Sequence, residues 1–173
     1  MTFILQTERL ILRKFITDDA EDMYDLNNDP EVMKHTGDIS FKSIEDARKL
    51  IINYSDYNNI GFGRWSVLLK EGNTFIGWCG LKKHPEGFVD LGFRFHKKYW
   101  NKGYATESAI ASLEYGFNNL NLVEIVGRSA SENIASRRVL EKLNMKFIKF
   151  EACEGIDNST LYKITREQFE NTL

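Results

Sequence analysis

The feature that most restricts the fold is a junction near the middle of the chain, where a strand-like segment passes into a helix with almost no loop. The segment "FVDLGFRFH" (88–96) has the alternation of a strand, and a helix rich in small residues is predicted for 103–119. A helix that begins so soon after a strand leaves its first N–H groups without partners, and its dipole adds positive charge there. The junction, with Gly103 at its centre, therefore predicts an anion site such as a pyrophosphate site.

A second interpretation of Gly103 is that it only relieves a tight turn, because one glycine is weak evidence for phosphate binding. The sequence contains neither the GxxxxGK[ST] motif of a P-loop nor a GxGxxG motif. A nucleotide-phosphate enzyme of the P-loop kind would also need acidic metal ligands, which the sequence does not indicate. Both interpretations of the glycine stay open at this point.

The remaining periodicity alternates between strands and helices, with no linker and no internal repeat, so one domain over 1–173 is predicted. The predicted class is α+β (mixed α/β), with a central, largely antiparallel and strongly twisted sheet of about seven strands flanked by helices. Strands are predicted at 9–15, 64–70, 74–83, 88–96, 122–130, 146–153 and 159–165. Helices are predicted at 17–29, 43–57, 103–119 and 133–144.

Composition excludes several classes of protein. The 173 residues are 42% hydrophobic, enough for a core, and the net charge of −2 gives no attraction toward nucleic acid or an anionic membrane. No apolar run approaches the ~20 residues of a membrane span, and the N-terminus does not resemble a signal peptide. Cys79 and Cys153 form no CxxC pair, so a reducing, cytoplasmic setting is expected. The three histidines show no ligand spacing with the cysteines, so no metal is expected.

Three segments, in the right order along the chain, carry a family resemblance. "LGFRFHKKYWNKGYATESAIASLEYGF" resembles the acetyl-CoA-binding signature of the GNAT superfamily of N-acetyltransferases. "TERLILRKF" with "TDDAEDMYDLNNDPEV" resembles the opening strand and first helix of its branch of ribosomal-protein N-terminal acetyltransferases, and "NIASRRVLEKLNMKF" resembles the second cofactor-contacting helix. The resemblance implies a GNAT-like acyl-CoA N-acyltransferase fold, with acetyl-CoA as co-substrate.

The resemblance also implies which residues hold the cofactor. The strand around Phe93, Arg94 and Phe95 would pair by main chain with the pantetheine arm, beside a bulge that splays it from the next strand. The backbone at the junction would hold the pyrophosphate through Asn101, Lys102, Gly103, Tyr104, Ala105 and Thr106. Two positions depart from the family pattern: Trp100 replaces a Gln or Arg, and Asn101 replaces the branch's additional glycine. Backbone donation survives both changes, while Lys97, Lys98 or Lys102 could meet phosphates at the mouth.

The candidate residues for catalysis each have a structural alternative. Asp90 is the first candidate for a general base; the alternative is that it is an exposed strand carboxylate, solvated or paired with Arg94. The family implies that Asn133 contacts the pantetheine arm, against a plain N-cap. Ser136 is a candidate proton donor to the sulfur, against a hydroxyl bonded to backbone. Tyr162 is an alternative proton donor to the sulfur, unless it is an ordinary aromatic residue of the sheet. The resemblance also implies that the Phe95 N–H donates to the thioester carbonyl.

The predicted function is an N-acetyltransferase that transfers acetyl directly from acetyl-CoA to a primary amine. The acceptor could be a protein N-terminus, a polyamine, an aminoglycoside or another small amine, and the branch resemblance favours a protein N-terminus. The acidic helix at 17–29 either attracts such an amine or is a solvated face. The alternative function is a non-catalytic acyl-CoA-binding sensor module. The sequence leaves open whether the protein is a monomer or a homodimer.

Overall fold

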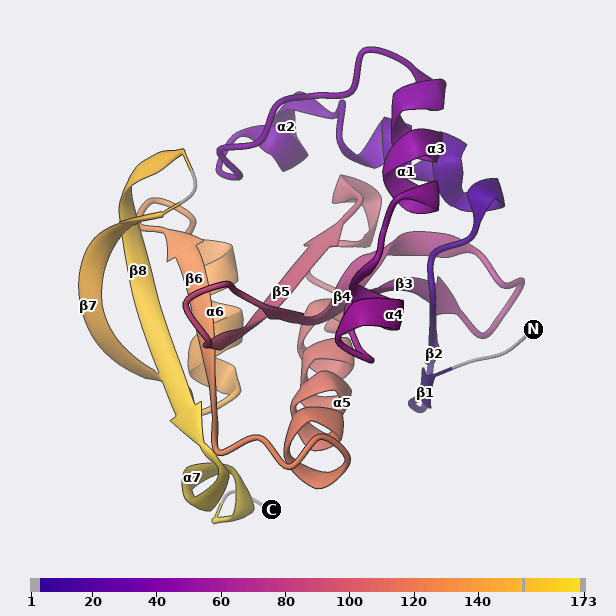
Figure 1. Ribbon diagram of the computed structural model, residues 1–173. Coiled ribbons are helices and arrows are strands. Elements are labelled where there is room, and N and C mark those ends of the chain that lie inside the picture. The colour runs from indigo at the N-terminus through magenta and orange to yellow at the C-terminus, as the bar shows by residue number, and fades with distance from the viewer. Residues whose placement is uncertain (1–3, 154, 172–173) are drawn as a thin grey trace.

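A computed structural model of the chain describes residues 4–153 and 155–171 (Figure 1). The described strands form an eight-stranded sheet in the order β1-β2-β3-β4-β5-β6-β8-β7. The strands are β1 (Leu5–Gln6), β2 (Leu10–Arg13), β3 (Arg64–Leu69), β4 (Phe75–Lys83), β5 (Val89–Phe95), β6 (Glu124–Ala130), β7 (Lys146–Cys153) and β8 (Ile156–Thr165). Neighbouring strands are antiparallel except β5 and β6, which are parallel. The predicted α+β class with a largely antiparallel sheet is confirmed.

The helices follow the predicted order but are more divided. The α-helices are α1 (Ala20–Leu26), α2 (Pro30–Met33), α3 (Ile44–Ile52), α4 (Asp56–Asn59), α5 (Tyr104–Asn118), α6 (Ile134–Lys142) and α7 (Arg166–Glu170), with 3-10 turns η1 (Thr17–Asp19) and η2 (Lys97–Tyr99). The predicted helix 43–57 was wrong in its second half, because the chain leaves the helix after Ile52 and starts α4 separately. The short elements β1, α2 and α7 were missed, since two to five residues carry no readable period.

Helices cover both faces of the sheet. On one face α1 and α3 pack over β4 around a cluster that includes Met23, Ala47 and Phe75. On the other face α5 and α6 contribute to the main core, and they contact each other. Because both faces of the central strands are covered, β3 is buried on both sides, with Trp65 toward the main core and Ser66 toward η1.

Helix α5 lies close to the sheet, which its small residues permit. Ala109 is fully buried, and a Cβ added at Gly116 would lie 2.7 Å from Ile125 Cδ1. The sequence predicts a core-facing apolar stripe of Ile110, Leu113 and Phe117 on this helix; Leu113 and Phe117 are fully buried, but Ile110 is exposed. The serines at positions 108 and 112 take buried positions, because each hydroxyl bonds back to a helix carbonyl, at 2.8 and 2.9 Å.

Strands β5 and β6 separate after a short pairing. They pair at Asp90–Val126 and Leu91–Gly127, whereas β5 continues to Phe95 and β6 to Ala130 with no further pairing between them in the described ranges. The resemblance implied a bulge at this separation, but the ladder between β4 and β5 keeps one register throughout. The sheet therefore divides between its fifth and sixth strands without a bulge on the β4 side.

Candidate functional site

The N-terminus of α5 presents backbone donors that no described residue uses. Gly103 is the N-cap in a left-handed conformation (φ 83°), and the first helical bond is donated by the Glu107 N–H to the Gly103 carbonyl, at 3.0 Å. The amides of residues 101–106 donate no hydrogen bond within residues 4–153 and 155–171. These donors and the helix dipole make a site suited to an anion.

The two departures from the family pattern have a structural explanation. Asn101 has a φ of 60°, and asparagine tolerates this left-handed conformation better than most residues, so it can stand where the branch has glycine. The Trp100 indole Nε1–H donates to the Phe95 carbonyl at 2.7 Å and so holds the loop against the end of β5. Both residues support the backbone at the junction.

Arg9, in the turn before β2, holds this junction in place and was missed by sequence reasoning. Its Nη1 donates to the Lys102 carbonyl at 3.0 Å, its Nε donates to Glu107 Oε2 at 2.7 Å, and its guanidinium lies 4.5 Å from the Tyr104 ring centroid. Burial alone would raise the pKa of Glu107, but the hydrogen bonds from Thr7 and Arg9 outweigh it and lower that pKa. Because Arg9 and Glu107 are 98 positions apart, no local pattern could reveal the pair.

The main chain of β5 alternates between two sides. The His96 N–H donates to the Ile76 carbonyl at 3.1 Å, and hydrogen-bonded pairs alternate in an antiparallel ladder. Arg94 therefore bonds toward β4, whereas the main-chain groups of Phe93 and Phe95 face the side from which β6 has separated. This is the arrangement in which an extended ligand can be added as a strand.

The Arg94 side chain points away from this edge. It donates to Asp38 Oδ2 at 2.5 Å and to the Asn27 side chain, and its guanidinium lies 5.3 Å from the Trp78 ring centroid. Arg94 therefore joins β5 to α1 and to the loop after α2. The suggested pairing of Asp90 with Arg94 is wrong, because Arg94 is paired with Asp38 and Asp90 has other partners.

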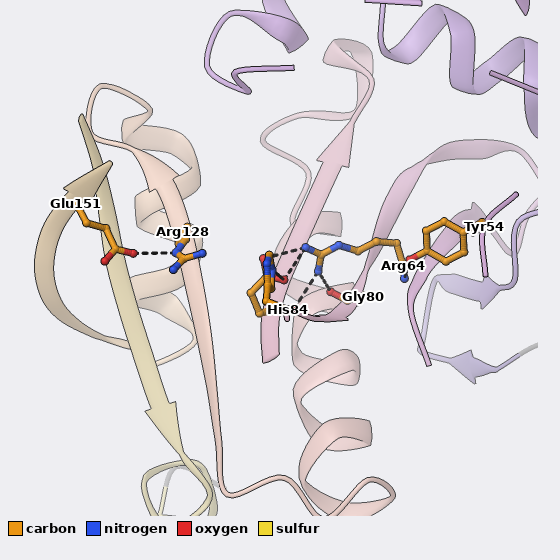
Figure 2. A network of polar contacts seen from close by, with 7 residues as sticks. Tyr54, Arg64, Gly80, His84, Arg128 and Glu151 are labelled. Carbon is orange, nitrogen blue, oxygen red and sulfur yellow. Dashed lines mark hydrogen bonds and ion pairs between the residues drawn. The ribbon is translucent and has the colours of Figure 1, made fainter. Parts of the chain in front are cut away.

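Asp90 is buried between two basic side chains. Arg64 Nη2 contacts Asp90 Oδ2 at 2.9 Å and Oδ1 at 3.0 Å, and His84 Nε2 lies 3.0 Å from Oδ1. Figure 2 shows Arg64 and His84 directed toward one another, with Arg64 also reaching the Gly80 carbonyl. Burial would raise the pKa of Asp90, but Arg64 first and His84 second override it and lower the pKa to about 2. A carboxylate of that pKa is a weak proton acceptor near neutral pH.

The start of α6 follows directly on β6, across the separation from β5. The Asn133 Oδ1 accepts from the Ser136 N–H at 3.1 Å, so the N-cap interpretation of Asn133 is confirmed. Ser136 is half-buried in the first turn. Both residues are therefore positioned at a second helix N-terminus beside the divided part of the sheet.

The hydroxyl of Tyr162, on β8, is already hydrogen-bonded within the protein. It is almost fully buried, donates to Glu141 Oε1 at 3.0 Å and accepts from Arg137 Nε at 3.3 Å. Both partners belong to α6, so the phenol binds that helix to the sheet. To protonate a sulfur, Tyr162 would have to leave these contacts.

Cys79 does not offer an activated nucleophile. Cys79 is fully buried on β4, where burial raises the pKa of its thiol, and its Sγ lies 3.6 Å from Ser112 Oγ. Cys153 ends β7, outside the segments described above. Within the described residues, no group of three His, Cys, Asp or Glu side chains is arranged to hold a metal ion. None of the described helices has the length and apolarity needed to cross a membrane.

A hollow of about 490 Å³ lies between α1 and the residues that follow β5. Its lining combines three carboxylates with three basic side chains: Asp22, Asp25, Asp29, His96, Lys97 and Lys98. Burial raises the pKa of Asp22, and burial together with Lys98 lowers the pKa of His96. Lys97 Nζ lies 3.6 Å from Glu31, and the ammonium groups of Lys98 and Lys102 lie over the Tyr99 ring.

Comparison with known proteins decides the family. Residues 9–146 match the acetyltransferase (GNAT) domain. The chain belongs to the GNAT acetyltransferase family. It is 36% identical over 143 residues to the uncharacterized N-acetyltransferase YnaD of Bacillus subtilis, with 82% of each chain covered. A GNAT acetyltransferase from Bacillus anthracis superposes with a TM-score of 0.82 at 32% identity, over 96% of this chain and 99% of that one.

Two further known proteins are similar to this GNAT acetyltransferase. The FsC-acetyl coenzyme A-N(2)-transacetylase of Aspergillus fumigatus is 32% identical over 186 residues, covering 95% of this chain and 77% of that protein. A putative ribosomal-protein-serine acetyltransferase from Vibrio cholerae superposes with a TM-score of 0.79 over 92% of this chain and 95% of that one. Its identity is 17%, so this second likeness shows the fold alone.

As a GNAT acetyltransferase, the protein is an N-acetyltransferase that uses acetyl-CoA as its co-substrate. The described residues fit this ligand, because the amides of 101–106 are without partners and the space over Gly103 is open. A Cβ added at Gly103 would meet only the tip of Arg9, at 3.2 Å. Acetyl-CoA would supply the acetyl group as an activated thioester, and the residues that would hold it are the amides of 101–106 and the edge of β5.

Replacing Arg9 with alanine is expected to weaken coenzyme A binding by about 3- to 10-fold. The variant loses the hydrogen bond to Lys102, the pair with Glu107 and the cover over Tyr104, so the loop at 101–103 is ordered less well before the ligand arrives. Isothermal titration with coenzyme A measures the change. Arg48→Ala is the matched control, since Arg48 is a similarly exposed arginine paired on α3, away from the junction. Equal affinity in wild type and Arg9→Ala would contradict the role.

Proposed function

We propose that this enzyme transfers acetyl directly from acetyl-CoA to a primary amine, with no acetyl group carried by the protein. The amine nitrogen forms the new amide bond as the thioester C–S bond breaks, and the proton lost by the amine balances the one gained by the thiolate. The burial of Cys79 supports a direct route, because a thiol of raised pKa is a poor nucleophile. Holding both reactants in one site supplies much of the rate.

The proposed cofactor site has two parts. The amides from Asn101 to Thr106, including Gly103 and Tyr104, bind the pyrophosphate, with Lys102 at the rim. The edge of β5 at Phe93 to Phe95 binds the pantetheine arm by main chain, and the Phe95 N–H donates to the thioester carbonyl. Asn133, at the N-terminus of α6, contacts the arm from the opposite side. The unpartnered amides at the start of α5 are the single observation that carries this proposal.

The proton transfers are assigned by elimination among the candidates. Asp90, with a pKa of about 2, is proposed to orient β5 through Arg64 and His84 more than to take a proton. The amine then enters neutral or loses its proton through water. Between Ser136 and Tyr162 as donors to the sulfur we favour Ser136, because the Tyr162 hydroxyl is occupied by Glu141 and Arg137.

The acceptor is proposed to approach from the face covered by α1 and α2. The carboxylates of Asp22, Asp25 and Asp29 line the hollow beside the end of β5, and carboxylates attract a cationic amine. The name of the Aspergillus fumigatus relative points to an N(2) acceptor, while the branch resemblance favours a protein N-terminus. The candidates are therefore a peptide α-amine, a polyamine, an aminoglycoside and another small amine.

An amine panel tests the proposal. Thiol release from acetyl-CoA is followed with each acceptor class, and the acetylated product is identified by mass spectrometry. We expect turnover with at least one primary amine and none with its N-acetylated form. Coenzyme A binding without turnover on any amine would overturn the transferase proposal and leave the sensor module. An Asp90→Asn variant whose pH–rate profile matches wild type would exclude Asp90 as the base, whereas a loss of about 100-fold or more would restore it.

A further inference from the structure

The outer edge of the sheet at β7 carries an apolar surface that the acetyl-transfer site does not use. β7 is the last strand of the sheet, so one side of its main chain has no neighbouring strand among those described. Phe147, Ile148 and Phe150 are 46, 47 and 61% exposed. A strand edge with three neighbouring apolar side chains in solvent is a template for pairing with another strand.

The two phenylalanines form one patch on one face of the sheet. Phe147 is paired with Tyr162 and Phe150 with Thr160, and these β8 positions are two residues apart, so both rings lie on the same face. Their ring centroids are 5.1 Å apart. Ile148 is the extra residue where the register shifts, which brings the two rings together.

The opposite face of the same strand carries complementary charges. Lys146 is paired with Lys163 and Glu151 with Ser159, which places both charged side chains on the face away from the phenylalanines. Glu151 accepts from Arg128 at 2.9 Å and lies 3.0 Å from Lys149 (Figure 2 shows the pair with Arg128), and burial is outweighed by Lys149 and Arg128, so its pKa is lowered. Lys146 is exposed and has no ion-pair partner within the described part of the chain.

We propose that β7 pairs with β7 of a second copy of this chain, antiparallel and around a two-fold axis between Ile148 and Lys149. In that register Lys146 lies opposite Glu151 of the second copy, and Phe147 lies opposite Phe150 of the second copy, each pair twice. Aromatic pairs and opposite charges across an antiparallel pair each stabilise it, and a two-fold axis makes the surface self-complementary. Lysines and bulges usually guard an edge strand, but here the bulge at Ile148 lies at the axis in both copies and each lysine has an acidic partner. The second register shift of β7, between Glu151 and Cys153, lies beyond the Lys146–Glu151 pair.

Sedimentation tests the interface. The wild-type chain is expected to dimerise reversibly with concentration, and Phe150→Lys is expected to weaken dimerisation by at least about tenfold, because it places a charge opposite an aromatic ring. Phe150 is exposed, so this variant keeps its fold. Ile52→Lys, at a 63% exposed isoleucine on α3, is the matched control and leaves the dimer unchanged. A wild type that stays monomeric, or a dimer indifferent to Phe150→Lys, would overturn the proposal.

Cross-linking tests the register. In a Cys153→Ser background, Phe147→Cys and Phe150→Cys are prepared as separate proteins and then mixed under mild oxidation. Only the mixture is expected to form a disulfide-linked dimer, since in either protein alone the new thiol faces a phenylalanine. Cross-linking within a single variant, or none in the mixture, would contradict the antiparallel register. Circular dichroism on each variant shows whether the fold is retained.

Discussion

Replacing Asp90 with alanine is expected to lower the free energy of unfolding by about 3–5 kcal/mol. The side chains of Arg64 and Asp90 are 13 and 12% exposed, and the carboxylate is the shared partner of Arg64 and His84. Removing it leaves a guanidinium buried without its counter-charge, which costs far more than the net contribution of the intact pair. Urea denaturation followed by circular dichroism measures the loss.

Asp38→Ala is the matched control for this effect. Asp38 also pairs with an arginine of the same face, Arg94, but its side chain is 54% exposed, so the expected loss is at most about 1 kcal/mol.

The pH dependence of stability is a second check on the role of Asp90. The pKa of Asp90 is about 2 in the folded chain against an ordinary 3.8, so this carboxylate stabilises the fold above pH 3.8 and the effect, about 2 kcal/mol, is lost as the pH falls toward 2.

The difference in stability between wild type and Asp90→Ala should therefore shrink in acid. A series of urea titrations from neutral pH to about pH 2 would follow it. If Asp90→Ala unfolds as easily as Asp38→Ala at neutral pH, then the buried pair with Arg64 does not exist as described. A stable Asp90→Ala with low activity would instead support a catalytic role.

Replacing Gly103 with valine is expected to raise the dissociation constant for coenzyme A at least about tenfold. Gly103 has a φ of 83°, a region that a β-branched residue occupies only with strain, and its side chain would lie among the amides proposed to bind the pyrophosphate. The backbone would have to turn those amides away or accept the strain. Isothermal titration with coenzyme A measures the effect.

Gly61→Val separates strain from ligand binding. Gly61 also has a positive φ, 91°, and open space around its missing Cβ, but it lies in the loop before β3. Both variants should lose comparable stability, about 1–3 kcal/mol, while only Gly103→Val loses affinity for coenzyme A. An unchanged affinity in Gly103→Val would refute the phosphate site at the start of α5 without touching the dimer proposal.

Local patterns predicted what depends on neighbours in sequence. The passage from strand to helix around Gly103 and the N-cap at Asn133 follow from residue types within a few positions, and the structure has both. The two-residue alternation of the strands is also a local pattern, so every strand of the sheet except β1 could be predicted from the sequence. Ile110 was placed wrongly because a helix with serines at 108 and 112 has no clear apolar stripe, and burial of their hydroxyls depends on bonds within the helix.

Partners distant in sequence could not be predicted. Arg9 contacts the Lys102 carbonyl from 93 positions away in sequence, and Asp90 is paired with Arg64 and His84 rather than with Arg94 on its own strand. Strand alternation puts Asp90 and Arg94, four residues apart, on one face of β5, but it does not say which side chains from other strands lie there. The low pKa of Asp90 follows from those partners, so the weakness of the base could not be foreseen.

The short pairing of β5 with β6 has a consequence for how the domain melts. Within the described residues β5 and β6 pair only at Asp90–Val126 and Leu91–Gly127, so side-chain packing in the main core, to which α5 and α6 contribute, supplies much of the cohesion between strands β1–β5 and strands β6–β8. A ligand strand laid along Phe93 to Phe95 would add strand-to-strand main-chain bonds where β5 and β6 make none in the described part of the chain. Binding of acetyl-CoA would then make unfolding more cooperative. Amide hydrogen exchange would slow along the boundary between strands β1–β5 and strands β6–β8, as well as at the residues that contact the ligand.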